Sequence, residues 1–361
     1  MEKKTVAVLG GGNGAHVMAA DLALKGHHVR MFEMSAYKGH MQKVFDTGEI
    51  VIDGVINGTA KLDLVTDDLE QAVDGADIIC LVTPAFAHPS YAEMLKGKVH
   101  KDQILITFPG AFGSLVIKKV FGDAECPVLA DTNNLPYTAR LKGPGHVTCT
   151  GRSLVNIGFF PGRAAEKYAD MLREVLFPFH VICANVLEAG LSLINPAFHT
   201  GPCLLNITNI ERPDVRFFVY EQGFSPSSAK VDKALDDERK AVGKALGADL
   251  HPLEDFLGLP VNTYTWQDLY KAGHGDIAMS VIEGPNDINN RYLTEDTPFG
   301  LVPWTQIGKQ IGVDMPVTNG IIDIYNVIHG KDWRKDGITA EDMGIDKMTK
   351  EELMRYVETG E

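Results

Sequence analysis

Short apolar runs alternate with helical segments over the first half of the chain. The apolar runs, each bounded by turn residues, are residues 5–9, 28–33, 76–83, 103–108 and 127–130. Segments of helical character lie between them, at residues 15–25, 69–73, 91–95 and 114–120. Near-continuous apolar strands separated by helices are typical of a parallel sheet covered on both faces. The pattern predicts an α/β fold with a doubly wound parallel sheet, and residues 138–141, 146–151 and 154–160 are expected to add further strands.

The second half of the chain has a different pattern. Residues 225–246 carry apolar side chains at helical spacing, with Ser225-Pro226 as the expected cap and first turn, and Gly247 as the expected end. Thr339 followed by Asp342, and Thr349 followed by Glu352, resemble two more helix starts. This half is therefore expected to be mostly α-helical.

The change of pattern predicts two domains, because the α/β region is expected to end near residues 181–184. A chain of 361 residues is also long enough for two domains of ordinary size. We expect a nucleotide-binding domain over residues 1–184 and a helical substrate-binding and catalytic domain over residues 185–361.

Composition and charge narrow the function classes. Hydrophobic residues make up 45% and charged residues 23%, and the formal net charge is −14. An acidic chain without a local basic stripe is a poor binder of nucleic acid or anionic membranes. No apolar run approaches the ~20 residues of a spanning helix, and residues 5–9 are too short for a signal-peptide core. Five scattered cysteines indicate neither a disulfide framework nor a zinc site, so the protein is expected to be cytoplasmic.

A glycine-rich turn follows the first predicted strand and precedes the first predicted helix. The pattern is G-x-G-x-x-A, in which the first glycine allows a tight turn and the second lets the backbone approach a pyrophosphate. The helix N-terminus then offers free N–H groups to the phosphates. The alternative is a glycine-rich turn without a ligand. We interpret the pattern as the dinucleotide site of a Rossmann-type domain, formed by Gly10, Gly12, Asn13, Gly14 and Ala15.

Glu33 bears on the choice of cofactor. It lies 21 residues after Gly12, at the end of the second predicted strand, where a carboxylate can bind both ribose hydroxyls. A carboxylate repels a 2′-phosphate, so NAD(H) is preferred, while the nearby Ser35 and Lys38 leave NADP(H) possible. The alternative for Glu33 is a solvated strand end. Pro84 and Pro109 follow two later strands and are expected either to line the nicotinamide ribose or simply to end their strands.

The catalytic residues are harder to find from the residues alone. A dehydrogenase needs a proton donor or acceptor near the hydride-accepting carbon, usually a histidine. Twelve histidines are present without a metal-binding spacing, so no metal is expected. His199 stands out because it follows an apolar helical stretch at the start of the second domain. Arg291 and Asp296 lie in a second notable segment, but composition does not rank these candidates.

Several segments resemble the opine dehydrogenase family, the octopine and nopaline dehydrogenase group. The resemblance extends from the N-terminal glycine pattern almost to the end of the chain. It is carried by the segments Val8–His16, Leu81–Ala85 with His88, Asn195-Pro-Ala-Phe-His199, Asn290-Arg291-Tyr292 through Glu295-Asp296, and Gly300–Pro303. The segments around His199 and Asp296 are more specific than the glycine pattern.

The resemblance implies roles for individual residues. His199 and Asp296 correspond to the catalytic pair of the family, and Arg291 to the arginine that holds a substrate carboxylate. Asn195 belongs to the same block as His199 and is assigned to substrate binding. The implied fold is a Rossmann domain followed by a helical domain like the C-terminal domain of 6-phosphogluconate dehydrogenase.

One segment departs from the family pattern. Where other members have Glu-Thr…Leu-Pro-Tyr…Arg, this chain has Asp131-Thr-Asn-Asn-Leu-Pro-Tyr137-Thr-Ala-Arg140. Asp131 and Tyr137 are predicted to contact the substrate, but the shorter Asp131 means that arginine cannot be assumed as the amino substrate. Tyr137 and Arg140 could equally be structural.

The reaction implied by the resemblance is the reductive condensation of a 2-oxo acid, pyruvate foremost, with the amino group of an amino acid through an imine. Two alternatives stay open. One is a reductase of a simple carbonyl, similar to ketopantoate reductase or glycerol-3-phosphate dehydrogenase, and the other is a dinucleotide sensor without turnover. The sequence names neither the amino acid nor the assembly, for which a homodimer is one option.

Overall fold

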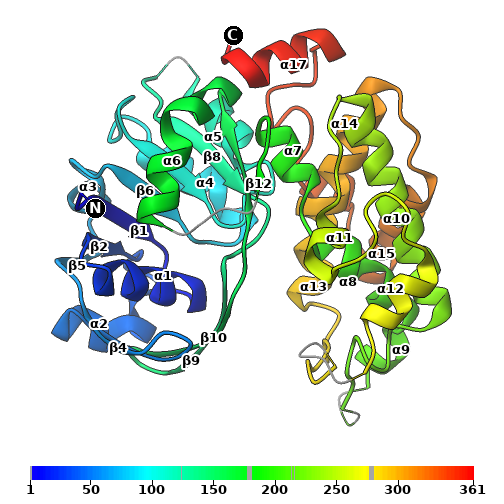
Figure 1. Cartoon of the computed structure of the whole chain (residues 1–361), viewed down its shortest axis with the longest axis horizontal. Helices are drawn as coiled ribbons and strands as arrows, with labels where there is room; N and C mark the ends of the chain where they lie inside the picture. The colour runs from blue at the N-terminus through cyan, green and yellow to red at the C-terminus, as the bar shows by residue number, and fades with distance from the viewer. Residues whose placement is uncertain (1, 123, 177–180, 213, 215, 276–279) are drawn as a thin grey trace. The chain divides into compact units, whose positions relative to one another are not determined.

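The computed structural model divides into two compact units. Unit 1 comprises Met1–Gly190 and Arg355–Glu361, and unit 2 comprises Leu191–Met354. The described residues are 2–122, 124–176, 181–212, 214, 216–275 and 280–361. The contacts thus place the division after Gly190, where the sequence pattern suggested residue 184, and return the last residues of the chain to unit 1 (Figure 1).

Unit 1 contains an eight-stranded sheet in the order β12-β11-β8-β7-β6-β1-β2-β5. The six strands from β5 to β8 are mutually parallel, which confirms the predicted parallel sheet. β11 runs antiparallel to β8, and the short strand β12 that follows α6 (Ala165–Val175) pairs with it in parallel. The strands are β1 (Thr5–Leu9), β2 (His28–Phe32), β5 (Leu64–Thr66), β6 (Ile78–Leu81), β7 (Ile104–Thr107), β8 (Val128–Thr132), β11 (Asn156–Phe160) and β12 (Val181–Ile182).

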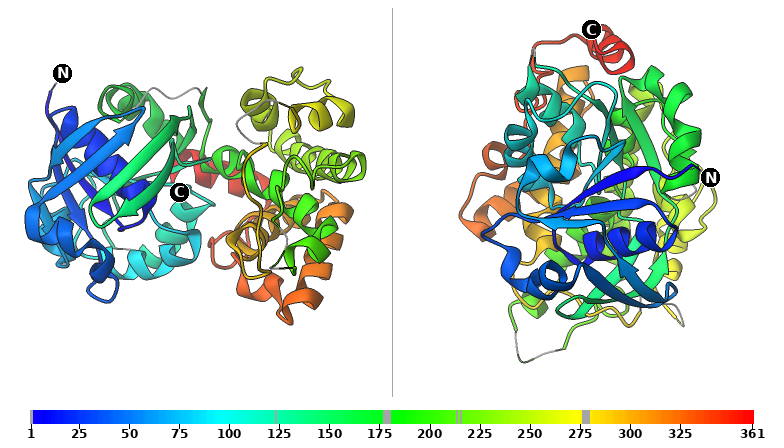
Figure 2. Two further views of the ribbon diagram at one scale, coloured as in Figure 1. Left: turned by 90° about the horizontal axis from the view of Figure 1, so that it is seen from below. Right: turned by 90° about the vertical axis from the view of Figure 1, so that its left-hand side faces the viewer.

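Helices cover both faces of this sheet (Figures 1 and 2). Alternate side chains of a strand point to opposite faces, and Val6 and Val8 share a buried core with α1 (Asn13–Leu24) and α6 (Ala165–Val175). On the other face, α4 (His88–Leu95) and α5 (Gly113–Phe121) pack against each other. The strand order reverses between β1 and β6, and ligands of such sheets bind at the carboxyl ends of the strands at this switch point.

A second sheet of four strands was only partly predicted. β9 (Tyr137–Gly143) and β10 (His146–Arg152) occupy the predicted segments, but β3 (Glu49–Gly54) and β4 (Gly58–Lys61) were missed. Helix α1 packs against this sheet as well as against β1 and β2, so it lies between the two sheets. β3 and β4 are short strands that pack against the side of α1 facing away from the large sheet. Each has too few alternating apolar residues to be recognised in the sequence.

Unit 2 is helical, as the sequence predicted. Ser225 caps α10 by accepting a hydrogen bond from the Ser228 amide, as expected. Thr349 likewise exchanges hydrogen bonds with Glu352 at the start of the last helix, α17. The expected helix at Thr339 is wrong: Thr339 and Asp342 make the same hydrogen bonds, but they close a turn. The principal helices of unit 2 are α8 (Asn195–Leu205), α10 (Pro226–Ala245), α11 (Pro252–Leu257), α12 (Trp266–Ala272), α14 (Val302–Ile311) and α15 (Pro316–His329). Helix α7 (Val186–Leu191) ends at the division between the units, and α17 (Lys350–Thr359) begins in unit 2 and ends in unit 1.

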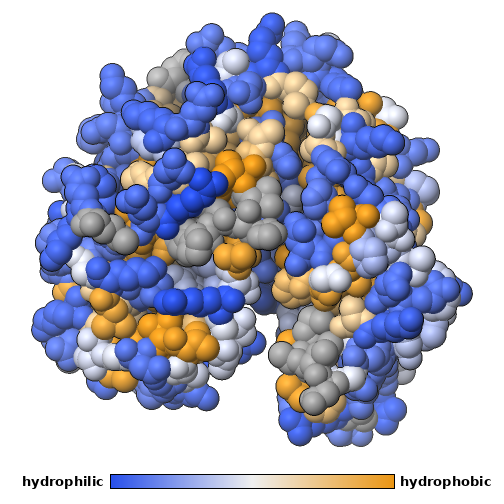
Figure 3. All heavy atoms as spheres, viewed as in Figure 1, coloured by the Kyte–Doolittle hydropathy of each residue, from blue (hydrophilic) through white to orange (hydrophobic). Residues whose placement is uncertain are grey.

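The surface of the protein is mostly polar. The face drawn in Figure 3 is mostly hydrophilic in each unit, with separate apolar patches. Over the described ranges, no helix combines the length and the apolar character required to cross a bilayer. Within the same ranges, no three His, Cys, Asp or Glu side chains are grouped as a metal site would require.

Candidate active site

Helix α8 carries the histidine that the sequence singled out. The helix begins at Asn195, with Pro196 in its first turn, where a missing N–H costs no hydrogen bond. Residues 196–203 of the helix are all buried, so α8 is a core helix of unit 2. His199 is 4% exposed, and Asn195 lies at the N-terminal end of the same helix with intermediate burial.

His199 forms a short hydrogen bond with Asp296. The Nδ1 atom lies 2.7 Å from Asp296 Oδ2, and the carboxylate side chain is 12% exposed. Asp296 is followed directly by a single π-helical turn, Thr297–Leu301. A Cβ on Gly300 would lie 2.2 Å from Pro196 Cγ, so the glycine allows this turn to approach α8 closely. A carboxylate at Nδ1 fixes the imidazole tautomer and leaves Nε2 for proton transfer.

Two tyrosines surround the imidazole of His199. The Tyr292 ring stacks on it, with ring centroids 3.8 Å apart and an interplanar angle of 10°. The Tyr220 hydroxyl lies 2.9 Å from Nε2, and Tyr220 is 5% exposed. Tyr292 was part of a segment that the sequence pointed to. Tyr220 was missed, because it lies in a loop between helices and belongs to no motif or periodic pattern that would have marked it.

Arg291 opens the short helix α13 (Arg291–Thr294), next to the stacked Tyr292. Its side chain is 65% exposed, and its Nη1 atom lies 3.7 Å from Glu295 Oε2. Exposed ion pairs of this kind contribute little stability, so the guanidinium can exchange this partner for a substrate carboxylate. The planar donors of arginine suit a bidentate contact with such a group.

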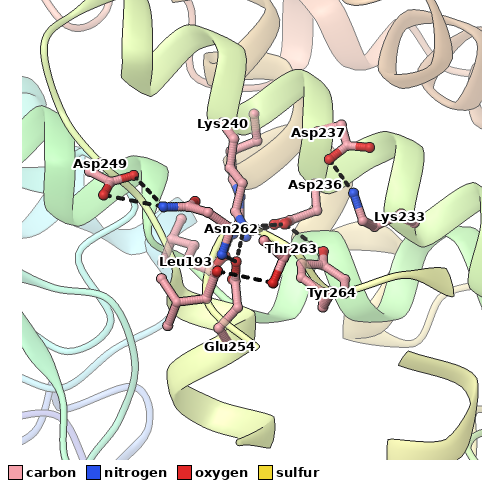
Figure 4. Close-up of polar contacts among 12 residues, drawn as sticks. Leu193, Lys233, Asp236, Asp237, Lys240, Asp249, Glu254, Asn262, Thr263 and Tyr264 are labelled. Atoms are coloured by element: carbon pink, nitrogen blue, oxygen red, sulfur yellow. Dashed lines mark hydrogen bonds and ion pairs between the residues drawn. The ribbon is translucent and has the colours of Figure 1, made fainter. Parts of the chain in front are cut away.

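A buried ionic cluster supports the start of α8 (Figure 4). Arg239 on α10 is fully buried and donates to the Leu193 carbonyl at 2.6 Å, two residues before α8 begins. It also pairs with the buried Asp236, which accepts from the Tyr264 hydroxyl at 2.6 Å. Lys240 Nζ lies 3.3 Å from the same Asp236 carboxylate. These cations hold the pKa of Asp236 below its usual value although burial alone would raise it.

The glycine-rich turn of unit 1 has the geometry that a dinucleotide requires. Gly10 has φ +117°, and a Cβ there would lie 2.6 Å from the Val82 carbonyl oxygen at the end of β6. No atom lies within 4 Å of the position of a Cβ on Gly12, which precedes α1 and leaves this space for a ligand. No side chain caps α1. Ala15 is fully buried, and Gly14 packs closely against Leu135. These residues fit a pyrophosphate at the start of α1.

Other residues assigned to the cofactor have mixed surroundings. The side chain of Asn13 accepts a hydrogen bond from the Leu141 amide at 2.8 Å, and so holds β9 onto α1. Pro84, which follows β6, is exposed, whereas Pro109 after β7 is half-buried and follows a cis peptide bond. His88, which was not assigned to the cofactor but belongs to a segment that carries the family resemblance, lies fully buried on α4. Burial lowers its pKa to about 4, so it is neutral near pH 7.

Glu33 follows β2 and lies against the glycine-rich turn. It is 6% exposed, its Oε1 accepts from the Met34 amide at 2.8 Å, and burial raises its pKa. The two polar residues that could favour a 2′-phosphate are both bound to Asp67. Lys38 Nζ lies 2.7 Å and Ser35 Oγ 2.9 Å from its Oδ2 atom.

Asp131 and Tyr137, assigned above to the substrate, both have internal partners in unit 1. Oδ1 of the fully buried Asp131 accepts hydrogen bonds from Thr107 Oγ1 at 2.6 Å and from the Ser114 amide at 2.9 Å. Burial raises the pKa of Asp131 to about 6, although these hydrogen bonds oppose the shift. The Tyr137 hydroxyl donates to Asp21 Oδ2 at 2.8 Å. The hydrogen bonds of Asp131 connect β8 with β7 and α5, and the hydrogen bond of Tyr137 connects β9 of the second sheet with α1.

Comparisons with known proteins agree with the division into two units. Residues 5–111 match the family described as NAD-dependent glycerol-3-phosphate dehydrogenase N-terminus. Residues 182–329 match the family described as NAD/NADP octopine/nopaline dehydrogenase, alpha-helical domain. A solved structure of octopine dehydrogenase with NADH and L-arginine superimposes with a TM-score of 0.77 at 22% identity, over 99% of this chain and 98% of that chain.

Relatives of known activity cover nearly the whole chain. The opine dehydrogenase of Arthrobacter sp. (strain 1C) is 32% identical over 99% of this chain and 100% of the relative. The octopine dehydrogenase of Mizuhopecten yessoensis is 26% identical over 94% of this chain and 93% of the relative. The chain therefore belongs to the opine dehydrogenase family, which comprises NAD(P)-dependent oxidoreductases acting on CH–NH bonds.

Proposed function

We propose that the protein condenses a 2-oxo acid, pyruvate foremost, with the α-amino group of an amino acid and reduces the resulting imine to a secondary amine dicarboxylate. The observation that carries this proposal is the buried His199–Asp296 hydrogen bond with Arg291 one residue from the stacked Tyr292. A proton-transfer group and a carboxylate anchor on adjoining segments suit a 2-oxo acid. A sensor has no use for a buried proton-transfer pair.

The chain's own residues handle the substrates and the proton. Arg291 holds the carboxylate of the oxo acid through its planar donors. His199 is the source of the proton that the departing hydroxyl of the carbinolamine requires, and it takes up a proton in the reverse direction. Asp296 holds the proton on Nδ1 and stabilises the imidazolium. NADH, held by the glycine-rich turn and Glu33 when bound, supplies the hydride.

A substrate screen tests the proposal against plain carbonyl reduction. NADH oxidation is followed with pyruvate alone and with pyruvate plus each of the twenty amino acids, and products are identified by mass spectrometry. We expect oxidation that depends on one or a few amino acids, with a product that joins the two carbon skeletons. Equal rates with pyruvate alone would indicate a simple carbonyl reductase. If no NADH is oxidised in any of these reactions, the screen is repeated with other 2-oxo acids, and no turnover with any of them would favour a sensor.

The cofactor preference is expected to follow Glu33. We expect a higher kcat/KM for NADH than for NADPH, because a partly desolvated carboxylate repels a 2′-phosphate and Asp67 already pairs with Lys38. Glu33→Ala should narrow the ratio of the two values. Glu93→Ala, which removes an exposed carboxylate on α4, should leave the ratio unchanged. A wild-type preference for NADPH would contradict the placement of Glu33 at the ribose.

A further inference from the structure

The nitrogen of His199 that the reaction needs is already in contact with a side chain. Asp296 takes Nδ1, so Nε2 is the nitrogen left for proton exchange with the substrate. The Tyr220 hydroxyl lies 2.9 Å from that atom. A substrate oxygen can reach Nε2 directly only if this hydroxyl moves away.

The surroundings of Tyr220 hold its ring in place. The ring stacks on Phe198 with centroids 5.1 Å apart and an interplanar angle of 23°. Phe198 in turn contacts Phe224 at a centroid distance of 5.2 Å. Both phenylalanines are 0–2% exposed. Close-packed aromatic rings resist displacement, because moving one would leave a destabilising cavity.

The phenol also stays protonated. Burial and neighbouring groups, among them Tyr292 and the carboxylates of Asp296 and Asp232, raise the pKa of Tyr220 well above 10. A neutral phenol can donate one hydrogen bond and accept another at the same time. The hydroxyl is therefore able to accept a proton from one neighbour while it gives its own to another.

We propose that Tyr220 is a catalytic residue that passes the proton between His199 and the substrate. This inference rests on the proposed function. In the condensing direction, the C–O bond of the carbinolamine breaks as the nitrogen lone pair forms the C=N bond. The departing oxygen takes the phenol proton of Tyr220 and leaves as water. The Tyr220 oxygen takes the Nε2 proton of His199 in the same step, so the tyrosine is unchanged and the imidazolium becomes neutral.

The experiment uses Tyr220→Phe, which keeps the ring and removes the hydroxyl. We expect kcat with pyruvate and the preferred amino acid to fall by about 10²-fold, at the lower end of the range for lost proton-transfer groups. The dissociation constant of NADH should stay unchanged. Tyr325→Phe is the matched control, because its buried hydroxyl donates to the Thr200 carbonyl of the same helix at 2.7 Å and does not contact His199. This control should keep kcat within a few-fold of wild type.

A proton inventory tests the relay in the wild-type enzyme itself. The rate is measured in mixtures of H₂O and D₂O under conditions in which imine formation limits kcat. Two protons moving in one step give a curved dependence on the deuterium fraction, and a single proton gives a straight line. A straight line in the wild type would overturn the relay, and so would unchanged or faster turnover by Tyr220→Phe. The Tyr220 hydroxyl would then be a group that the substrate displaces from His199 Nε2. An inactive wild type would instead refute the proposed function.

Discussion

Replacing His199 with alanine is expected to lower kcat by about 10²–10⁴-fold, which is the range for a lost general acid or base. The substitution removes the proton-transfer group and its hydrogen bonds to Asp296 and Tyr220. NADH binding should be nearly unchanged, because the glycine-rich turn and Glu33 belong to unit 1 and His199 to unit 2. Steady-state kinetics at saturating substrates and fluorescence titration of NADH give the two measurements.

Further variants test whether His199 and Asp296 act as a catalytic pair or whether loss of His199 only disturbs the local structure. Asp296→Asn should also be slow, and the double variant should be little slower than either single one, because groups that act as a unit are strongly non-additive. Arg291→Lys should chiefly raise KM for the oxo acid through loss of the bidentate contact. His274→Ala serves as the control, since His274, just after α12, bonds through Nδ1 to the Tyr270 carbonyl and is not a partner of Asp296 or Tyr220. Near-normal kcat of His199→Ala would refute the assignment.

Replacing Arg239 with methionine is expected to have the largest effect on stability. Breaking a buried ion pair by removing one partner typically costs about 3–5 kcal/mol, because the other charge is left without compensation. Arg239 is fully buried, pairs with Asp236, donates to the Leu193 carbonyl and lies over the Trp304 ring at 5.1 Å. Its loss should lower the midpoint of unit 2 unfolding, measured by thermal and urea denaturation with circular dichroism.

A surface arginine provides the matched control. Arg173→Met removes the partner of Asp170 in an exposed i,i+3 pair on α6, which should change stability by less than about 1 kcal/mol. Similar losses for both variants would show that Arg239 contributes through general packing and not through its buried charge. Because α8 begins two residues after Leu193, Arg239→Met should also reduce kcat in the fraction that stays folded.

Much of unit 1 followed from the sequence alone. Strands that are buried on both faces must be apolar throughout, so β1, β6 and β7 were visible as continuous apolar runs. The turn at Gly10 was equally visible, because φ +117° is accessible to glycine at little cost. The short strands β3 and β4 escaped, since each gains its stability from α1 and from its neighbours in the second sheet.

The tertiary structure decided which face of α10 is buried. The helical spacing of apolar side chains over residues 225–246 predicted the helix, but of these side chains the structure half-exposes Val231 and exposes Ala241. It buries Asp232, Asp236 and Arg239 instead. Asp236 and Arg239 form an ion pair within α10, and their further hydrogen bonds come from the Tyr264 hydroxyl and the Leu193 carbonyl. Local periodicity contains no information about these remote hydrogen-bond partners, which a buried charged group requires.

The same distinction applies to the active site. The sequence identified His199, Asp296 and Arg291 through segments that resemble a family, but their separation of up to 97 residues says nothing about distance. The close approach of the Gly300 turn to Pro196 brings the carboxylate to the imidazole. The Tyr220 hydroxyl reaches His199 Nε2 because the Tyr220 ring stacks on Phe198 of α8, which holds the loop against that helix. Residue types and local propensities thus determined the fold class and the chemistry available, whereas packing between elements remote in sequence decided which groups meet.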